Sequence, residues 1–249
     1  MAGAGVAEPG ADSGRPVPSA ADPLEAFEYE LKFGLRGRSV AAVRQWLRTI
    51  CRVDPVFPTG RVCSVYYDTP AFHHLRENAN SDYLKTKVRL RWYEQVVTAG
   101  DRAFLEAKFR FGPRRNKVRL EVLHTGRQLA AMPLHAAELG AMPARLREVG
   151  VMTPTALRPI VLVRYRRDRF IEPLSGVRVS LDAEISAPAA NRAVLPTIDP
   201  RPLATAVVEV KGLVNELPQP LRPLVALGGR RRSFSKYAEC YARAAREQF

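Results

Sequence analysis

Apolar and polar residues alternate along most of the chain after residue 27, and turn residues bound each alternating stretch. A period of two is typical of a β-strand with one buried face, because successive side chains point to opposite sides of a sheet. The pattern predicts eight strands, over Phe27–Leu35, Arg61–Tyr67, Thr86–Tyr93, Arg102–Arg110, Lys117–Val122, Ile160–Phe170, Val177–Ile185 and Ala206–Val210.

Three other stretches have the apolar spacing or the breaks expected of helices. Ser39–Cys51 carries one apolar stripe and begins with a residue that can cap a helix. A second helical zone, Arg127–Val151, is expected to break near Pro133 and Pro143, and a last helix is predicted over Ser235–Glu247. Many strands and few helices favour an α+β fold, which we expect to be an antiparallel β-barrel of about eight strands with a polar interior and helices packed outside.

The first 24 residues differ from the rest in composition. They are rich in Ala, Gly, Pro and Ser and lack the basic start and apolar run of a signal peptide. We therefore expect a disordered tail over residues 1–24 and a single domain over residues 25–249. The three cysteines are widely spaced, without a CxxC pair, and no run approaches the roughly 18 apolar residues of a membrane span. A cytoplasmic location is expected.

The polar side chains in the alternating stretches are mostly charged. Glu28, Glu30 and Lys32 share one face of the first predicted strand. Further charged residues that share a face are Lys87, Arg89 and Arg91; Glu106 and Lys108; Arg164 and Arg166; Asp182 and Glu184; and Glu209 and Lys211. At least six strands thus have one apolar and one charged face.

The net charge of +14, from 39 Lys and Arg against 25 Asp and Glu, indicates a polyanionic partner. Two arrangements of the charged faces are open. They could form the solvated side of a sheet, with ion pairs between strands. They could instead point into a barrel, where the cations would repel one another without a ligand or water. The excess of Arg and Lys over carboxylates favours the second arrangement, because a phosphate chain would neutralise it.

The residue types suit phosphate chemistry. Guanidinium groups bind phosphate oxygens in pairs, and ammonium groups act as point charges. Glutamates among so many cations either orient the basic side chains or hold a divalent cation, Mn²⁺ or Mg²⁺, that bridges phosphates. Enzymatic phosphoryl transfer needs mainly positioning and neutralisation of charge.

Seven short segments occur in the order in which they occur in a known superfamily. The segments are Tyr29–Lys32, Ser64–Pro70, Lys87–Arg91, Leu105–Lys108, Val163–Arg166, Val208–Lys211 and Ser235–Tyr237. By these segments and their order the chain resembles the triphosphate tunnel metalloenzymes and, within them, the vacuolar transporter chaperone (VTC) catalytic domain. The resemblance covers Phe27 to Tyr241.

The resemblance implies an enzyme, a phosphotransferase that moves the γ-phosphate of ATP to a growing polyphosphate chain, with Mn²⁺ or Mg²⁺ as cofactor. The acceptor phosphate would be the nucleophile, so no Ser, Cys or His nucleophile is needed. The residues it implies as catalytic, lining the tunnel and holding phosphates, are Lys32, Arg89, Arg91, Lys108, Arg164, Arg166, Lys211 and Lys236. Further phosphate contacts would come from Lys87, Arg119 and Ser235. The metal would be held mainly by Glu209, with Glu30, Glu28, Glu106 and Glu184 as further carboxylates.

Glu28-Tyr29-Glu30-Leu31-Lys32 departs from the VTC pattern. It spells the ExExK motif of the CYTH branch, whose triphosphatases and adenylate cyclases use the paired glutamates for metal. Two alternatives therefore stay open, a metal-dependent inorganic triphosphatase and a non-catalytic polyphosphate- or polyanion-binding protein. The expected partners are ATP and polyphosphate or triphosphate, with no nucleic acid. A membrane-protein partner and the oligomeric state are not determined by the sequence.

Overall fold

The computed structural model describes residues 28–79, 84–94, 102–111, 114–153 and 157–246. The tail predicted over residues 1–24 lies outside these residues. In the part of the chain so described, no helix has the length and apolar character needed to cross a membrane.

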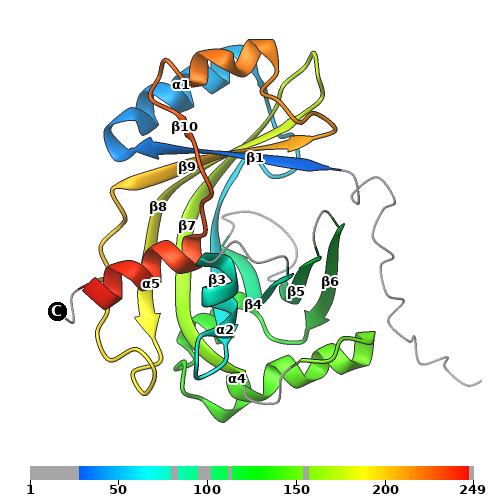
Figure 1. Cartoon of the computed structure of the whole chain (residues 1–249), viewed down its shortest axis with the longest axis vertical. Coiled ribbons are helices and arrows are strands. Elements are labelled where there is room, and N and C mark those ends of the chain that lie inside the picture. The colour runs from blue at the N-terminus through cyan, green and yellow to red at the C-terminus, as the bar shows by residue number, and fades with distance from the viewer. Residues whose placement is uncertain (1–27, 80–83, 95–101, 112–113, 154–156, 247–249) are drawn as a thin grey trace, which may run out of the picture.

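The described chain forms one ten-stranded sheet in which all pairings are antiparallel (Figure 1). The strand order is β10-β1-β9-β8-β7-β3-β4-β5-β6, and β2 pairs with β7 off this path. The strands are β1 (Tyr29–Arg36), β2 (Arg52–Val53), β3 (Thr59–Asp68), β4 (Leu84–Glu94), β5 (Ala103–Phe111), β6 (Arg114–Val122), β7 (Arg158–Ile171), β8 (Arg178–Ala190), β9 (Thr205–Gly212) and β10 (Arg230–Arg231). All eight predicted strands are present, and the prediction missed only the two-residue strands β2 and β10.

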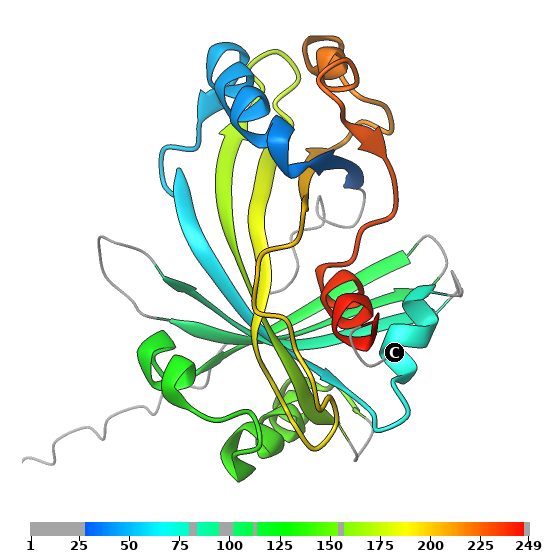
Figure 2. The same ribbon diagram turned by 90° about the vertical axis from the view of Figure 1, so that its left-hand side faces the viewer.

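The predicted closure into a barrel is wrong. β10 and β6 end the strand order, and among the described residues no pairing joins them. The sheet bends strongly instead: in Figure 2, β3, β7 and β8 stand upright while β4, β5 and β6 run across below them. The sheet therefore curls around a concave face without closing, and the α+β antiparallel class is confirmed.

Two groups of helices cover the convex face of the sheet. The 3₁₀ turn η2 (Gly37–Ser39), α1 (Val40–Ile50) and η4 (Gln219–Leu224) lie over the half formed by β1, β8 and β9. The short helices α3 (Gly126–Ala131), α4 (Ala137–Ala141) and η3 (Met142–Val149) lie over β3–β6. Apolar side chains at alternate strand positions fill both interfaces, as the period of two predicts.

The helix α5 (Lys236–Arg246) departs from the expectation that all helices pack outside. It packs against the concave face, next to the missed helix α2 (His73–Ala79), and it lies across β7 and β8 in Figure 1. Tyr237 stacks on Tyr66 of β3, with ring centroids 5.2 Å apart, and its hydroxyl donates to Oδ2 of buried Asp68 at 3.0 Å. These contacts anchor α5 beside the space that the sheet encloses.

A β-bulge in β8 changes which side chains face inward. Glu184 has a φ of 54°, and Arg164 and Arg166 of β7 oppose Ser186 and Ala183, so that β8 holds one extra residue. Asp182, before the bulge, is buried, whereas Glu184 is exposed. The prediction that these two carboxylates share a face is therefore wrong.

Truncation of a core side chain should test the packing of the α3–α4–η3 layer. Leu105 of β5 is fully buried in this cluster, so Leu105→Ala should lower the free energy of unfolding by about 2–5 kcal/mol. Leu123 is 96% exposed, and Leu123→Ala should stay within about 0.5 kcal/mol of the parent. Urea unfolding followed by circular dichroism measures both; equal losses would contradict the assigned core.

Candidate functional site

The concave face of the sheet encloses a cavity of about 880 Å³. Among the described residues, fifteen Lys and Arg and only four Asp and Glu line it. The lining side chains come from β1, β4–β10, the loop before β3 and the segment between β10 and α5. The cavity is therefore strongly cationic, and anions are the ligands that it suits.

One wall of the cavity is organised around a buried glutamate, Glu106 of β5. Its Oε2 lies 2.6 Å from Nη2 of Arg89 and 4.0 Å from Nη1 of Arg91, and its Oε1 lies 3.6 Å from Nε of Arg119. Burial raises the pKa of Glu106, but Arg89 and Arg91 outweigh this effect and hold the pKa well below its usual range. Glu106 therefore stays ionised and fixes the direction of three guanidinium groups.

Arg91 is further held by two neutral groups. Its Nε donates to Oγ of Ser64 at 3.0 Å, and its Nη2 donates to the hydroxyl of Tyr165 at 3.3 Å. These contacts tie β4 to β3 and β7, so that the guanidinium is positioned by three strands.

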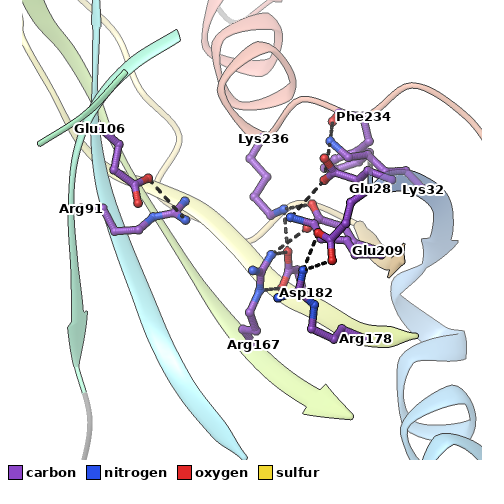
Figure 3. Close-up of polar contacts among 12 residues, drawn as sticks. Glu28, Lys32, Arg91, Glu106, Arg167, Arg178, Asp182, Glu209, Phe234 and Lys236 are labelled. Carbon is purple, nitrogen blue, oxygen red and sulfur yellow. Dashed lines mark hydrogen bonds and ion pairs between the residues drawn. The ribbon is translucent and has the colours of Figure 1, made fainter. Parts of the chain in front are cut away.

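The opposite side carries a cluster of two cations and two anions, to which we refer as the Lys236 cluster: Arg167, Asp182, Glu209 and Lys236. The Lys236 Nζ lies 2.6 Å from Asp182 Oδ2 and 2.9 Å from Glu209 Oε1. Arg167 forks onto Asp182 with two bonds of 2.6 Å and also reaches Glu209 Oε2 at 2.9 Å. Figure 3 shows this cluster facing Arg91 and Glu106 from across the site.

The charges of the Lys236 cluster balance one another. Burial raises the pKa of Glu209, yet Lys236 and Arg167 hold it well below its usual range. Burial lowers the pKa of Lys236, yet Asp182 and Glu209 raise it above the ordinary lysine value. Glu209, Lys236 and Arg167 therefore stay charged, and the cluster joins α5 to β7, β8 and β9.

Glu30 of β1 sits among less tightly paired lysines. Its Oε1 lies 3.5 Å from the Nζ of Lys32 and 3.7 Å from the Nζ of Lys211. Burial raises the pKa of Glu30, but these lysines lower it to about 2. Lys32 also donates to the carbonyl of Phe234 at 3.2 Å, which links β1 to the segment before α5.

Two lysines of the cavity are held near other cations. Burial, together with Lys32, Arg89 and Lys85, lowers the pKa of Lys87 to about 8, although Glu30 acts in the opposite direction. Burial and the nearby Arg89 and Lys211 lower the pKa of Lys108 well below the ordinary lysine value. A bound polyanion would relieve this repulsion.

The model of the VTC domain family matches residues 27–245. The chain belongs to the VTC domain family. No curated protein sequence matches it.

The fold of this VTC domain is similar to that of a solved structure. A candidate adenylate cyclase from Bacillus halodurans is 12% identical with a TM-score of 0.50, and the match covers 84% of this chain and 93% of that one. HpAC1 from Hippeastrum, a candidate adenylyl cyclase described as having a dominant triphosphatase activity, is 14% identical with a TM-score of 0.48; the match covers 86% and 96% of the two chains.

The fold brings most of the sequence-predicted site residues to the cavity. Those that line it are Lys32, Lys87, Arg89, Arg91, Lys108, Arg119, Lys211, Glu28, Glu30 and Glu106. Glu209 and Lys236 lie in the Lys236 cluster. Ser235 lies at the start of α5, where its Oγ accepts a bond of 3.4 Å from the Ala238 N–H.

Three predicted residues lie on the other face of the sheet. Arg164, Arg166 and Glu184 surround a separate pocket of about 170 Å³. Arg164 donates to Glu94 at 2.7 Å, and Arg166 lies 3.4 Å from Asp168. The prediction that these three residues line the tunnel is therefore wrong. For Glu184, the bulge in β8 accounts for its position on the other face.

Sequence reasoning missed Arg167 and Arg169, the two arginines of β7 that line the cavity. They alternate with Tyr165, whose hydroxyl meets Arg91, so Tyr165, Arg167 and Arg169 share the inward face. Residues 164–169 read Arg-Tyr-Arg-Arg-Asp-Arg, with cations at both parities. The alternation alone therefore did not show which face of β7 points into the cavity. Because Tyr165 was counted as apolar, the face that carries Arg164 and Arg166 was predicted to point inward, and this was wrong.

The carboxylates that line the cavity suit a divalent cation only when a bound ligand supplies further oxygen atoms to the ion. In the described ranges, no group of three or more His, Cys, Asp and Glu side chains is arranged to hold a metal. Mg²⁺ is usually held by one or two carboxylates together with substrate phosphates. Glu28 and Glu30 line the cavity two residues apart and fit this mode, although both oxygens of Glu28 accept hydrogen bonds from the exposed Arg178 and Oε1 of Glu30 meets Lys32 and Lys211. Both oxygens of Glu209 already meet buried cations, so Glu209 fits it less well.

The charge of Lys87 predicts a pH dependence of anion binding. Because the pKa of Lys87 is lowered to about 8, the amine is cationic below this pH and neutral above it. The affinity for tripolyphosphate should therefore fall as the pH rises from 7 to 9. Lys87→Arg keeps the positive charge throughout and should remove this step. Calorimetric titrations across this range measure both proteins; superimposable pH profiles would contradict the assignment.

Loss of the Glu106 carboxylate should destabilise the protein. Glu106→Gln leaves Arg89 and Arg91 buried without their anion, so the free energy of unfolding should fall by about 3–5 kcal/mol. Glu121→Gln breaks the exposed pair with Arg102, 2.6 Å long, and serves as the matched control with little change expected. Denaturant unfolding compares the two, and a similar small effect in both would refute the anchoring role.

Proposed function

We propose that this VTC domain is an ATP-dependent polyphosphate polymerase that transfers the γ-phosphate of ATP to a growing polyphosphate chain. The observation that carries the proposal is the row of cations on β4: Lys85, Lys87, Arg89 and Arg91 all line the cavity. At about 3.3 Å per residue this row spans roughly 20 Å. A single triphosphate group is much shorter than such a row, whereas a phosphate chain would use its full length.

The transfer step needs little covalent chemistry from the protein. An oxygen of the terminal acceptor phosphate attacks the γ-phosphorus, and a new P–O bond forms. The bond between the γ-phosphorus and the β,γ-bridging oxygen breaks, and ADP leaves with that oxygen. The acceptor chain gains one phosphate, and no protein nucleophile takes part.

The arginines around Glu106 would hold the reacting phosphates. Arg89, Arg91 and Arg119 are already oriented by one carboxylate, so little reorganisation is needed when negative charge develops. Their guanidinium groups can each contact two phosphate oxygens. Lys108 and Lys211 would add charge along the chain, and the Lys236 cluster would keep α5 in place.

A divalent cation, Mn²⁺ or Mg²⁺, would neutralise phosphate charge when bound. Glu30 and Glu28 would hold it, with phosphate oxygens completing its coordination. Glu30 is ionised at neutral pH, as a metal ligand must be.

A metal-dependent triphosphatase is the second candidate, because all three charged residues of the ExExK motif, Glu28, Glu30 and Lys32, line the cavity. In that reaction water replaces the acceptor phosphate, so orthophosphate is released and no chain grows. A polyanion-binding protein without activity would turn over neither substrate.

The products formed from ATP and Mn²⁺ test the proposal. The purified protein should produce ADP and phosphate polymer, detected by gel electrophoresis and phosphorus NMR. Arg89→Ala should lower the rate by about 10²-fold or more, as expected for loss of a preorganised charge. Arg164→Ala, on the other face of the sheet, should retain the parental rate.

Each other outcome points to a different function. If the protein releases orthophosphate without forming polymer, and Glu28→Ala abolishes this release, the protein is a triphosphatase and not a polymerase. If the protein binds ATP and tripolyphosphate but turns over neither, it is a polyanion-binding protein without activity. Equal losses in Arg89→Ala and Arg164→Ala would refute the assignment of the cavity as the site.

A further inference from the structure

We propose that one end of the cavity is a nucleobase subsite, in which the base of ATP stacks on Phe57 beside Arg169. This inference rests on the proposed function, because it takes a nucleoside triphosphate as the phosphate donor. It adds a binding group that the phosphate contacts alone do not supply.

Phe57 is an aromatic residue at the cavity wall whose side chain is only partly buried. It lines the cavity, yet 47% of its surface is exposed. Its turn is fixed by Asp54, whose Oδ1 accepts from the N–H groups of Val56 at 2.9 Å and Phe57 at 2.8 Å. The ring is thus presented to the cavity without being packed into the core, which is the arrangement needed to stack a planar ligand.

Arg169 of β7 supports this ring. Its Nη1 donates to the carbonyl of Phe57 at 3.2 Å, and its guanidinium carbon lies 5.9 Å from the ring centroids of both Phe57 and Tyr93. Aromatic rings and guanidinium planes are the groups on which proteins stack nucleobases. Phe57, Tyr93 and Arg169 come from different segments of the chain, and all three line the cavity.

The two ends of the cavity differ in chemistry, and this difference places the base. Along β4, Tyr93 and Lys85 are eight residues apart, about 26 Å in a strand. At the Tyr93 end lie the rings of Phe57 and Tyr93 and the guanidinium plane of Arg169. Towards the other end, Lys87, Lys108 and Lys117 lie at paired positions on β4, β5 and β6.

Lysine ammonium groups attract phosphates as point charges and offer no flat surface to a base. The base therefore fits the end with Phe57, and the phosphates fit the arginines and lysines further along β4. Because every base has a π-face, stacking tolerates different bases. ATP and GTP should bind with similar affinities.

Phe57→Ala tests the subsite. Its affinities for the non-hydrolysable β,γ-imido analogue of ATP and for inorganic tripolyphosphate are measured by calorimetry. The affinity for the analogue should fall by roughly 5- to 150-fold, the loss expected for one stacked base, whereas the affinity for tripolyphosphate should change less than about twofold. Phe57→Trp should retain binding of the analogue.

Val56→Ala is the matched control. Val56 is in the same loop and 68% exposed but is not among the residues that line the cavity, so both affinities should be unchanged. Arg169→Lys provides a second variant that keeps the charge and removes the guanidinium plane. It should weaken the analogue more than tripolyphosphate.

The outcomes separate this inference from the proposed function. If the parent protein binds both ligands and Phe57→Ala leaves the analogue unaffected, or weakens both ligands equally, the nucleobase subsite is refuted and the phosphate site stands. If the parent binds neither ligand, the proposed function itself fails. Selective loss of the analogue in Phe57→Ala supports the subsite.

Discussion

Repulsion among the cations on the concave face is the constraint that shapes this protein. Fifteen basic and four acidic side chains of the described residues share one cavity, and the few carboxylates are placed where they hold several cations at once. Glu106 meets three arginines, and Glu30 meets two lysines. The remaining charge excess is seen in Lys87 and Lys108, whose pKa values burial and neighbouring cations lower. Within the protein the excess positive charge of the cavity is not neutralised, so the cavity is electrostatically complementary to a polyanion.

The fold supports this arrangement by dividing its surfaces. Two apolar clusters on the convex face, under α1 and under the α3–α4–η3 layer, contribute hydrophobic stabilisation away from the charged side. The sheet can therefore devote much of its concave face to arginine and lysine.

The helix α5 connects the two kinds of interaction. Its Tyr237 belongs to an apolar cluster with Tyr66 and donates to Asp68, whereas its neighbour Lys236 meets Asp182 and Glu209. The helix is thus held on the concave face of the sheet through both packing and ion pairs. The Lys236 cluster is nearly neutral, which leaves the net positive charge to the residues that line the open space.

The sequence by itself determined the eight longer strands and the charged faces of β1, β4, β5 and β9, because a period of two assigns alternate residues to opposite faces. The ordered motifs also indicated the VTC family, which the family match confirms. Only the tertiary structure decided the open sheet, the position of α5 and the inward face of β7. Strand closure and helix docking depend on the bend of the whole sheet, which no local pattern records. The inward face of β7 could not be predicted because arginines occur at both odd and even positions of this strand. Asp182 and Glu184 lie on different faces because a bulge adds one residue to β8 between them, and the alternation of residue types in the sequence does not show this bulge.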